Sequence, residues 1–251
     1  MYKINSRELN SSQPNYVFKT SKSKIEIALK MDQGSAHAVL QNEACFFDGK
    51  ESNLRNKLTT LTLSMYHPLL CRQIPLTVMD CESENTENIV IFWQIFNECL
   101  RRESGKKDIL FNPQAFCLDM AGCNREAGIC VFGEHFLNKV KSCEFHYKQC
   151  RNRQRNKLKN EIDQSIFTKL TGALLQALTI EAFQAMYDDL LAFVDESLER
   201  ECLRRWIRWW YGRRSNPISC TTSFNFHPLA LQTWRAGRRN LPNGASPGAT
   251  L

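Results

Sequence analysis

Apolar and polar residues alternate along several stretches in the first third of the chain. Residues 57 to 66 alternate between two sets of side chains, one of leucine and methionine and one rich in threonine. A similar stretch covers residues 73 to 80, and a short apolar run covers residues 43 to 48. Alternation with a period of two is typical of β-strands with one buried face. The pattern therefore predicts a meander of three antiparallel strands.

The spacing of apolar residues becomes helical between residues 84 and 102. Ile89, Phe92, Phe96 and Leu100 recur at intervals of three or four and so fall on one face of a helix. Several glutamates stand near the start of this stretch, where the helix dipole favours negative charge. The sequence therefore predicts an amphipathic helix over residues 84 to 102.

Shorter patterns complete the list of predicted elements. They are a strand over residues 115 to 119, a short helix over 125 to 132, a strand over 140 to 147 and a helical stretch over 160 to 205. We expect the last stretch to break near Gly172 or at Thr179, whose hydroxyl could cap a second helix.

The predicted elements follow one another as three strands, a helix, a strand, a helix and a strand, with a long helical segment after them. This is the order of the ribonuclease H-like fold in the α/β class, although order alone leaves other α/β arrangements open. The predicted organisation is a polar lead-in over residues 1 to 40, a core over 41 to 159, a helical segment over 160 to 215 and an irregular, flexible tail over 216 to 251.

The composition is that of a folded protein with a moderate positive charge. The chain has 251 residues, of which 43% are hydrophobic and 24% charged, with a net charge of +7. These values exclude a collagen-like or disordered chain. The charge fits a surface that binds polyanions, and it also fits many ordinary proteins. No window approaches about eighteen consecutive apolar residues, so we expect no membrane partner.

The cysteines point to an intracellular compartment. There are eleven, an odd number, and most lie inside apolar runs. The first residues of the chain lack the apolar core of a signal peptide. This combination predicts reduced thiols rather than a disulfide framework.

Two acidic residues follow apolar runs that resemble buried strands. Asp48 comes after Cys45-Phe46-Phe47, and Asp119 comes after Phe116-Cys117-Leu118. Two carboxylates on neighbouring strands can hold Mg²⁺, which prefers oxygen ligands, and a pair of such ions can cleave a phosphodiester. On pattern alone, the favoured interpretation is that both acids are simply strand-end residues at turns.

Cys143 and His146 form a Cys-x-x-His motif on the predicted last strand. A thiolate and an imidazole are good zinc ligands, but the pair supplies only half of a tetrahedral site. Nearby residues that could complete it are Cys130, His135 and Cys150. The alternative, favoured on spacing alone, is a packed cysteine beside a hydrogen-bonded histidine.

A basic stretch follows the same strand. Between residues 139 and 159 there are eight basic side chains and one acid, Glu144. The basic residues are Lys139, Lys141, Lys148, Arg151, Arg153, Arg155, Lys157 and Lys159. Such a rim binds phosphate backbones with an affinity that depends on salt. A solvated loop and helix start is an equally good interpretation.

Aromatic residues alternate with arginines over residues 206 to 214, which read WIRWWYGRR. Such a cluster can stack bases and hold phosphates. The favoured interpretation is that it docks the end of the helical segment onto a core.

Taken together, these pieces resemble the core of Mutator-like (MULE) transposases over residues 40 to 215. The matching pieces are CFFDGK (45 to 50), YHPLL (66 to 70), MDCESE (79 to 84), FCLDMAG (116 to 122) and CEFH (143 to 146). The resemblance implies a ribonuclease H-like domain with a DDE triad, Mg²⁺- or Mn²⁺-dependent cleavage and transfer of DNA strands, and a helical insertion before the third acid. Asp48 matches the first acid, Asp119 the second, and Cys143 and His146 the family's CxxH.

The chain departs from the family at the third acid. The matching place reads FHPLALQTW (226 to 234) and holds no carboxylate. The family's N-terminal zinc-binding, DNA-reading module is also missing. The resemblance therefore implies a truncated or catalytically impaired transposase-derived domain that associates with DNA in the nucleus and is compatible with a homo-oligomer. The alternative is a non-catalytic protein-interaction protein or a domesticated DNA-binding protein.

Overall fold

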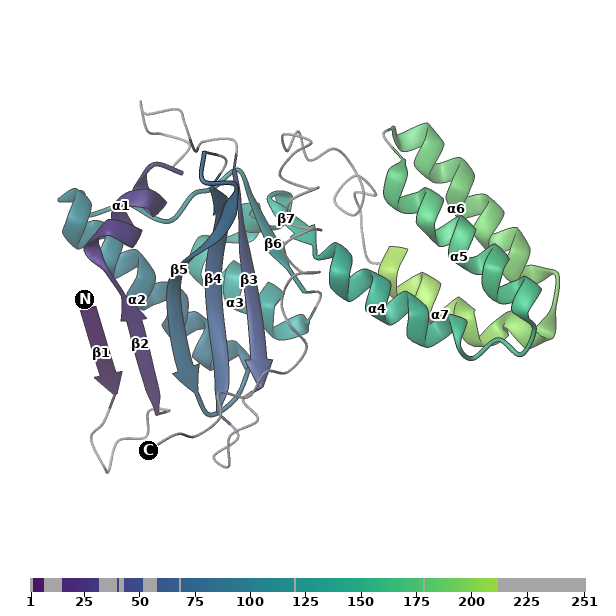
Figure 1. Cartoon of the computed structure of the whole chain (residues 1–251), viewed down its shortest axis with the longest axis horizontal. Helices are drawn as coiled ribbons and strands as arrows, with labels where there is room; N and C mark the ends of the chain where they lie inside the picture. Colours follow the sequence, from purple (N-terminus) through teal and green to yellow (C-terminus); the bar gives the residue numbers. More distant parts are fainter. Residues whose placement is uncertain are drawn as a thin grey trace. The chain divides into compact units, whose positions relative to one another are not determined.

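The computed structural model describes residues 2–6, 15–31, 40, 43–51, 58–67, 69–119, 121–177 and 179–211 (Figure 1). The chain forms two compact units and passes from unit one to unit two between Ala115 and Phe116. The predicted boundary between core and helical segment, at residue 160, lies inside unit two. Each unit combines helices with strands, so the α/β class is confirmed.

The strands of unit one pair in the order β1-β2-β5-β4-β3, and every neighbouring pair is antiparallel. They are β1 (Tyr2–Ser6), β2 (Tyr16–Thr20), β3 (Ala44–Glu51), β4 (Thr59–His67) and β5 (Arg72–Cys81). The strands β3, β4 and β5 follow one another in the chain and pair in that order, so the predicted meander is confirmed. Their alternating pattern directs one set of side chains to each face of the sheet.

The described part of the polar lead-in, residues 2–6, 15–31 and 40, contains regular structure that the sequence pattern did not predict. The strand β2 pairs with β5 along its whole length, and the helix α1 (Lys22–Leu29) buries Ile25 and Ala28. The lead-in has few apolar residues, so its pattern gives little sign of a strand. Pairing to the edge of β5 satisfies the backbone hydrogen bonds of β2 without requiring a long apolar stretch.

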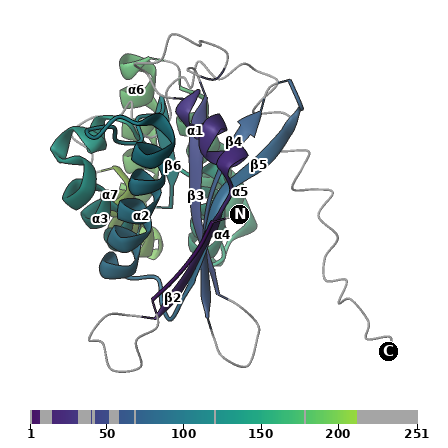
Figure 2. The ribbon, with the colours of Figure 1, turned by 90° about the vertical axis from the view of Figure 1, so that its left-hand side faces the viewer.

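The predicted amphipathic helix is α2 (Thr86–Ser104). The side chain of Asn85 accepts a hydrogen bond from the backbone N–H of Asn88 at its start, and Gly105 ends it in the left-handed conformation. Figure 2 shows α2 beside one face of the strands. On that face, the ring of Phe92 lies 5.7 Å from Phe18 of β2 and 5.0 Å from Phe47 of β3. These aromatic contacts are part of the core of unit one.

Unit two begins within β6 (Ala115–Leu118) and continues with α3 (Gly122–Phe132), the 3₁₀ helix η2 (Glu134–Asn138) and β7 (Val140–Ser142). β6 and β7 pair in parallel. The predicted strand over residues 140 to 147 is wrong beyond Ser142, because the helix α4 (Glu144–Arg155) starts two residues later. The more buried positions Cys143, Tyr147 and Cys150 are spaced by four and three, which suits a helix rather than a strand.

The remaining helices are α5 (Glu161–Gln176), α6 (Ile180–Asp195), the 3₁₀ helix η3 (Leu198–Arg200) and α7 (Glu201–Tyr211). The prediction of a break at Thr179 is confirmed, since its hydroxyl accepts from the backbone N–H of Ala182. Gly172 lies inside α5 and does not interrupt it. Among the described helices, none has the length and apolar character needed to cross a membrane.

Candidate functional site

Asp48 lies within β3, with its side chain exposed, rather than at the end of a strand as predicted. The strand continues to Glu51, and Asp48 stands opposite Thr62 of β4. Its neighbour Phe47 is buried against α2. Because successive residues of a strand point to opposite faces, Asp48 lies on the face of the sheet away from α2.

A polar network that the sequence pattern did not predict occupies the same face. Thr60 stands opposite Asp80, and residues two apart in a strand share a face, which places Asp80 on the face of Asp48. The Thr60 hydroxyl and the Lys19 ammonium each donate to the Asp80 carboxylate at 2.7 Å. Burial raises the pKa of Asp80, but these two hydrogen bonds and the charge of Lys19 outweigh it, so the pKa lies below its ordinary value.

Asp119 follows β6 directly, as predicted, and its carboxylate organises the turn into α3. One oxygen, Oδ1, accepts from the backbone N–H of Ala121 at 3.1 Å and from the side-chain amide of Asn124. Asn124 is buried. Asp119 thus follows a strand and makes local hydrogen bonds of the kind that aspartate makes at turns.

The two expected Mg²⁺ ligands fall in different units of the chain. Asp48 belongs to unit one and Asp119 to unit two. Among the residues that the structure describes, no three His, Cys, Asp or Glu side chains are grouped so that they could hold a metal ion. The place of the third acid, residues 226 to 234, lies outside the described residues. A role for Mg²⁺ or Mn²⁺ therefore stays a prediction, and we derive no chemical step through it.

The predicted pair Cys143 and His146 lies at the start of α4, and the structure adds Cys117 of β6 to it. The Cys117 side chain and both the side chain and the backbone of His146 influence the ionisation of the Cys143 thiol, and Cys143 makes no side-chain capping hydrogen bond to α4. The backbone N–H of Cys143 donates to the carbonyl of Leu118 at 2.8 Å, which extends the pairing of β6 with β7 by one residue.

These contacts stabilise the thiolate form of Cys143. The neighbouring Cys117 makes the largest contribution, burial opposes it, and His146 adds to the effect of Cys117, so the pKa of Cys143 falls to about 4. Burial instead raises the pKa of Cys81 to about 11 and also raises the pKa values of Cys99 and Cys150. Cys143 thus differs chemically from these other buried and half-buried thiols.

The proposed zinc ligands beyond Cys143 and His146 do not join them in a recognised group. Cys130 and His135 are exposed on α3 and η2, and Cys150 is half-buried on α4. A zinc ion at Cys143 and His146 stays a prediction, which elemental analysis of the purified protein would test. The Cys117 contact could not be found from spacing, because it depends on the pairing of β6 with β7.

The basic stretch runs through β7, α4 and the segment before α5. Lys141 lies in β7, where burial lowers its pKa. Lys148 pairs with Glu144 on α4, and Lys159 pairs with Glu199. Lys139 and Lys157 lie outside regular α-helix and strand. The three arginines of the stretch, Arg151, Arg153 and Arg155, are all on α4.

Those three arginines carry charge that no acid in the described residues neutralises by an ion pair. Arg151 donates to the side chain of Asn152, and Arg155 donates to that of Asn156, so both bind neutral amides. Arg153 is exposed. Arg204 of α7 differs from them, because it pairs with two carboxylates. The surface of α4 therefore carries a concentration of positive charge from these arginines.

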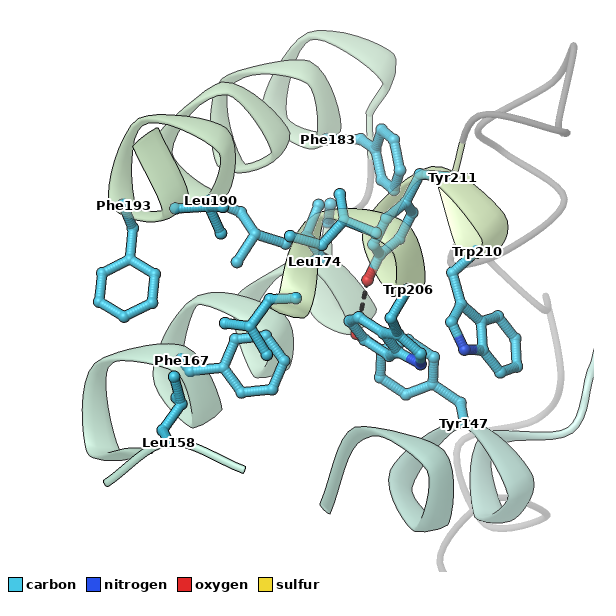
Figure 3. Close-up of a cluster of buried hydrophobic side chains, with 14 residues drawn as sticks. Tyr147, Leu158, Phe167, Leu174, Phe183, Leu190, Phe193, Trp206, Trp210 and Tyr211 are labelled. Atoms are coloured by element: carbon cyan, nitrogen blue, oxygen red, sulfur yellow. Dashed lines mark hydrogen bonds between the residues drawn. The ribbon is translucent and has the colours of Figure 1, made fainter. Parts of the chain in front are cut away.

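The aromatic cluster of α7 is part of the helical core, as the favoured interpretation predicted. Trp206 and Trp210 are buried, and their rings lie 5.8 Å and 5.1 Å from that of Tyr147 on α4 (Figure 3). Trp209 is 40% exposed. The segment from Gly212 to Arg214 lies outside the described residues.

Comparison with known proteins finds no family model that matches the chain and no curated protein that matches it.

Proposed function

We propose that the chain is a transposase-derived domain with a ribonuclease H-like core that associates with DNA and does not cleave it on its own. The order β3-β4-β5-α2-β6-α3-β7 supports the fold, since three antiparallel strands precede a helix, a strand, a helix and a strand. The parallel pairing of β6 and β7 is a further feature in its favour. The nucleus is the compartment that this origin implies.

The observation that carries the proposal is the unneutralised charge of α4. Phosphate contacts supply most of the affinity of non-specific DNA binding, and arginine suits them because its guanidinium donates two parallel hydrogen bonds. Arg151 and Arg155 are separated by one helical turn, so both can reach one DNA backbone. Each must exchange only an amide partner for a phosphate, which costs less than breaking a buried ion pair.

The experiment measures binding of a fluorescent DNA duplex by the full chain across a range of salt concentrations. Replacing Arg151, Arg153 and Arg155 together by glutamine should reduce the slope of log K against log salt by about 2 to 3, because each phosphate contact contributes about 0.9. The matched control replaces Arg102, Lys106 and Lys107 by glutamine. These residues are exposed in unit one, and their replacement removes the same amount of charge.

The control should change the slope much less than the α4 variant. Equal slopes for the two variants would show that net charge alone governs binding. Absence of binding by the unmodified chain at low salt would overturn the proposed association with DNA.

A further inference from the structure

The outward side of the helix α6 carries exposed carboxylates that form no ion pair with the residues that the structure describes. Glu181 and Asp188 are exposed and lie two helical turns apart on one side of α6, opposite the buried Leu190. Asp189 is exposed beside them. Asp188 accepts a hydrogen bond from the side-chain amide of Gln184 at 2.9 Å, and this neutral partner leaves the charge of the carboxylate uncompensated. The helix α6 therefore presents a negative face to the outside of unit two.

Two exposed alanines lie among these carboxylates. Ala185 follows Glu181 by four residues and Ala192 follows Asp188 by four, so all of them share one side of α6. The short alanine side chains leave room for a second helix to approach, because the distance between packed helices depends on the side chains at the contact. The carboxylates can then reach cations at the edges of such a contact. The negative face of α6 thus has the form of a helix-binding surface.

The helix α4 carries the complementary features. The ring of Phe145 is 43% exposed, and covering such a ring with an apolar surface is favourable. Arg151 and Arg155 follow on the same helix, with neutral amides as their hydrogen-bond partners. A guanidinium forms a stronger hydrogen bond with a carboxylate than with an amide. The faces of α4 and α6 are therefore opposite in charge, and the large ring on one suits the small residues on the other.

The two complementary faces cannot meet within one chain. The helices α4 and α6 each pack against α5 and α7. Figure 3 shows Tyr147 of α4 and Leu190 of α6 entering the same core from opposite sides, and both side chains are buried there. The helices α4 and α6 therefore occupy opposite corners of the helical bundle, with α5 and α7 between them. The α4 that α6 can bind is thus that of another copy.

We propose that the negative face of α6 binds α4 of a second copy of the chain in an antiparallel contact between the two helices. The order of the residues sets this direction. Phe145 precedes both arginines on α4, whereas Ala192 follows the carboxylates of α6. Packing the Phe145 ring on Ala192 therefore brings the arginines to the carboxylates only when the two helices run in opposite directions.

The spacing of the charges fits this contact. Arg151 and Arg155 are about 6 Å apart along α4, and Asp188 and Glu181 are about 10 Å apart along α6. The long arginine side chains span the difference, so each guanidinium reaches one carboxylate. Two different faces meet, so successive copies add head to tail and form a ring or an open chain rather than a closed two-fold dimer. DNA should compete for the same arginines, and this consequence alone rests on the proposed function.

The test measures the molar mass of the full chain by sedimentation equilibrium, without DNA and with a reducing agent present to prevent disulfide cross-links. In about 50 mM salt the average mass should rise with protein concentration beyond that of a dimer. In about 500 mM salt it should fall to that of the monomer, because ions screen the charges at the edges of the contact.

Two charge-reversed variants identify the faces that meet. Asp188→Lys with Asp189→Lys makes α6 positive like α4, and Arg151→Glu with Arg155→Glu makes α4 negative like α6. Each variant alone should remain monomeric in low salt. An equimolar mixture of the two should associate, since each variant again offers the charge that the other lacks. Association of the mixture would also show that both variants fold.

The matched control is Glu26→Lys with Asp108→Lys, which makes the same change of charge at exposed residues of unit one and should associate far more than the α6 variant. The proposal is overturned if the unmodified chain is monomeric in low salt, or if either reversed variant alone associates as the unmodified chain does. It is also overturned if the mixture stays monomeric while the unmodified chain associates. Failure of DNA binding would change none of these outcomes and would overturn only the proposed function.

Discussion

The phenolic oxygens of Tyr147 on α4 and Tyr211 on α7 lie 2.6 Å apart within the helical core of unit two. Tyr147 also donates to the carbonyl of Thr171 on α5 at 3.0 Å. Since a phenol has one proton, Tyr211 is the donor of the bond that the two tyrosines share. Tyr147 therefore connects three helices through one oxygen, and Figure 3 shows its bond to Tyr211.

Removing the Tyr147 hydroxyl should destabilise the protein more than removing that of Tyr211. Tyr147→Phe loses two buried hydrogen bonds and should cost about 1–3 kcal/mol, whereas Tyr211→Phe loses one and should cost about 0.5–1.5 kcal/mol. Urea unfolding measures both. Tyr187→Phe, half-buried on α6, is the control and should stay within about 0.5 kcal/mol of the unmodified chain. A larger cost for Tyr211→Phe than for Tyr147→Phe would contradict the donor assignment.

Two glycines in helices should respond oppositely to alanine. A Cβ on Gly128 of α3 would lie 2.0 Å from the ring of Phe136, which is itself packed against Phe116 and Phe132. Gly128→Ala should therefore cost about 1–3 kcal/mol through overpacking. A Cβ on Gly172 of α5 meets nothing within 4 Å, so Gly172→Ala should stabilise by up to about 1 kcal/mol. Thermal unfolding compares them, and equal shifts would contradict the packing at Gly128.

Asp80 should make stability depend on acid pH. Its pKa is lowered in the folded state, so it contributes stability that is present above the unfolded carboxyl pKa and is lost as pH falls through the folded one. Asp80→Asn should therefore flatten the decline in unfolding free energy below about pH 5, where carboxylates start to protonate. Lys19→Met, which removes the ion pair, should have the same direction of effect. A decline as steep in Asp80→Asn as in the unmodified chain would show that other acids cause it.

The chain alone should not nick supercoiled or branched DNA, even with Mn²⁺. Two-metal phosphoryl chemistry must hold both the attacking and the leaving oxygen, and the matching place for the third acid has no carboxylate. Two acids of the helical insertion are engaged elsewhere, since Asp195 pairs with Arg204 and Glu196 with Arg200. Nicking that disappears in both Asp48→Ala and Asp119→Ala would contradict this prediction.

Other carboxylates are candidates if nicking is observed. They are Glu82, Glu84 and Glu87 near the start of α2, and Asp188 and Asp189 on α6. Glu84 packs against Gly49, the residue after Asp48. Replacing each by alanine in turn would identify the substitute.

The sequence by itself determined the elements whose signals are local. The helix α2 was predictable because its apolar residues recur at helical spacing, and the start of α6 because a hydroxyl stands at Thr179. The meander of β3, β4 and β5 was predictable because β4 and β5 keep alternation with a period of two and β3 follows a short apolar run. The turn role of Asp119 was equally local, since Asp119 binds groups two and five residues away.

Only the tertiary structure decided the relationships between distant residues. Residues 16 to 20 of the lead-in form the strand β2 because they pair with the edge of β5. The same pairing brings Lys19 next to Asp80, which is 61 residues away in the chain. The start of α4 at Glu144 brought Cys143 to Cys117, a contact that depends on the register of β6 and β7. Periodicity reports which face of an element is buried. Periodicity carries no information about which strand edges meet, and the pairing of those edges placed the carboxylate of Asp80 beside Lys19 and Cys143 beside the end of β6.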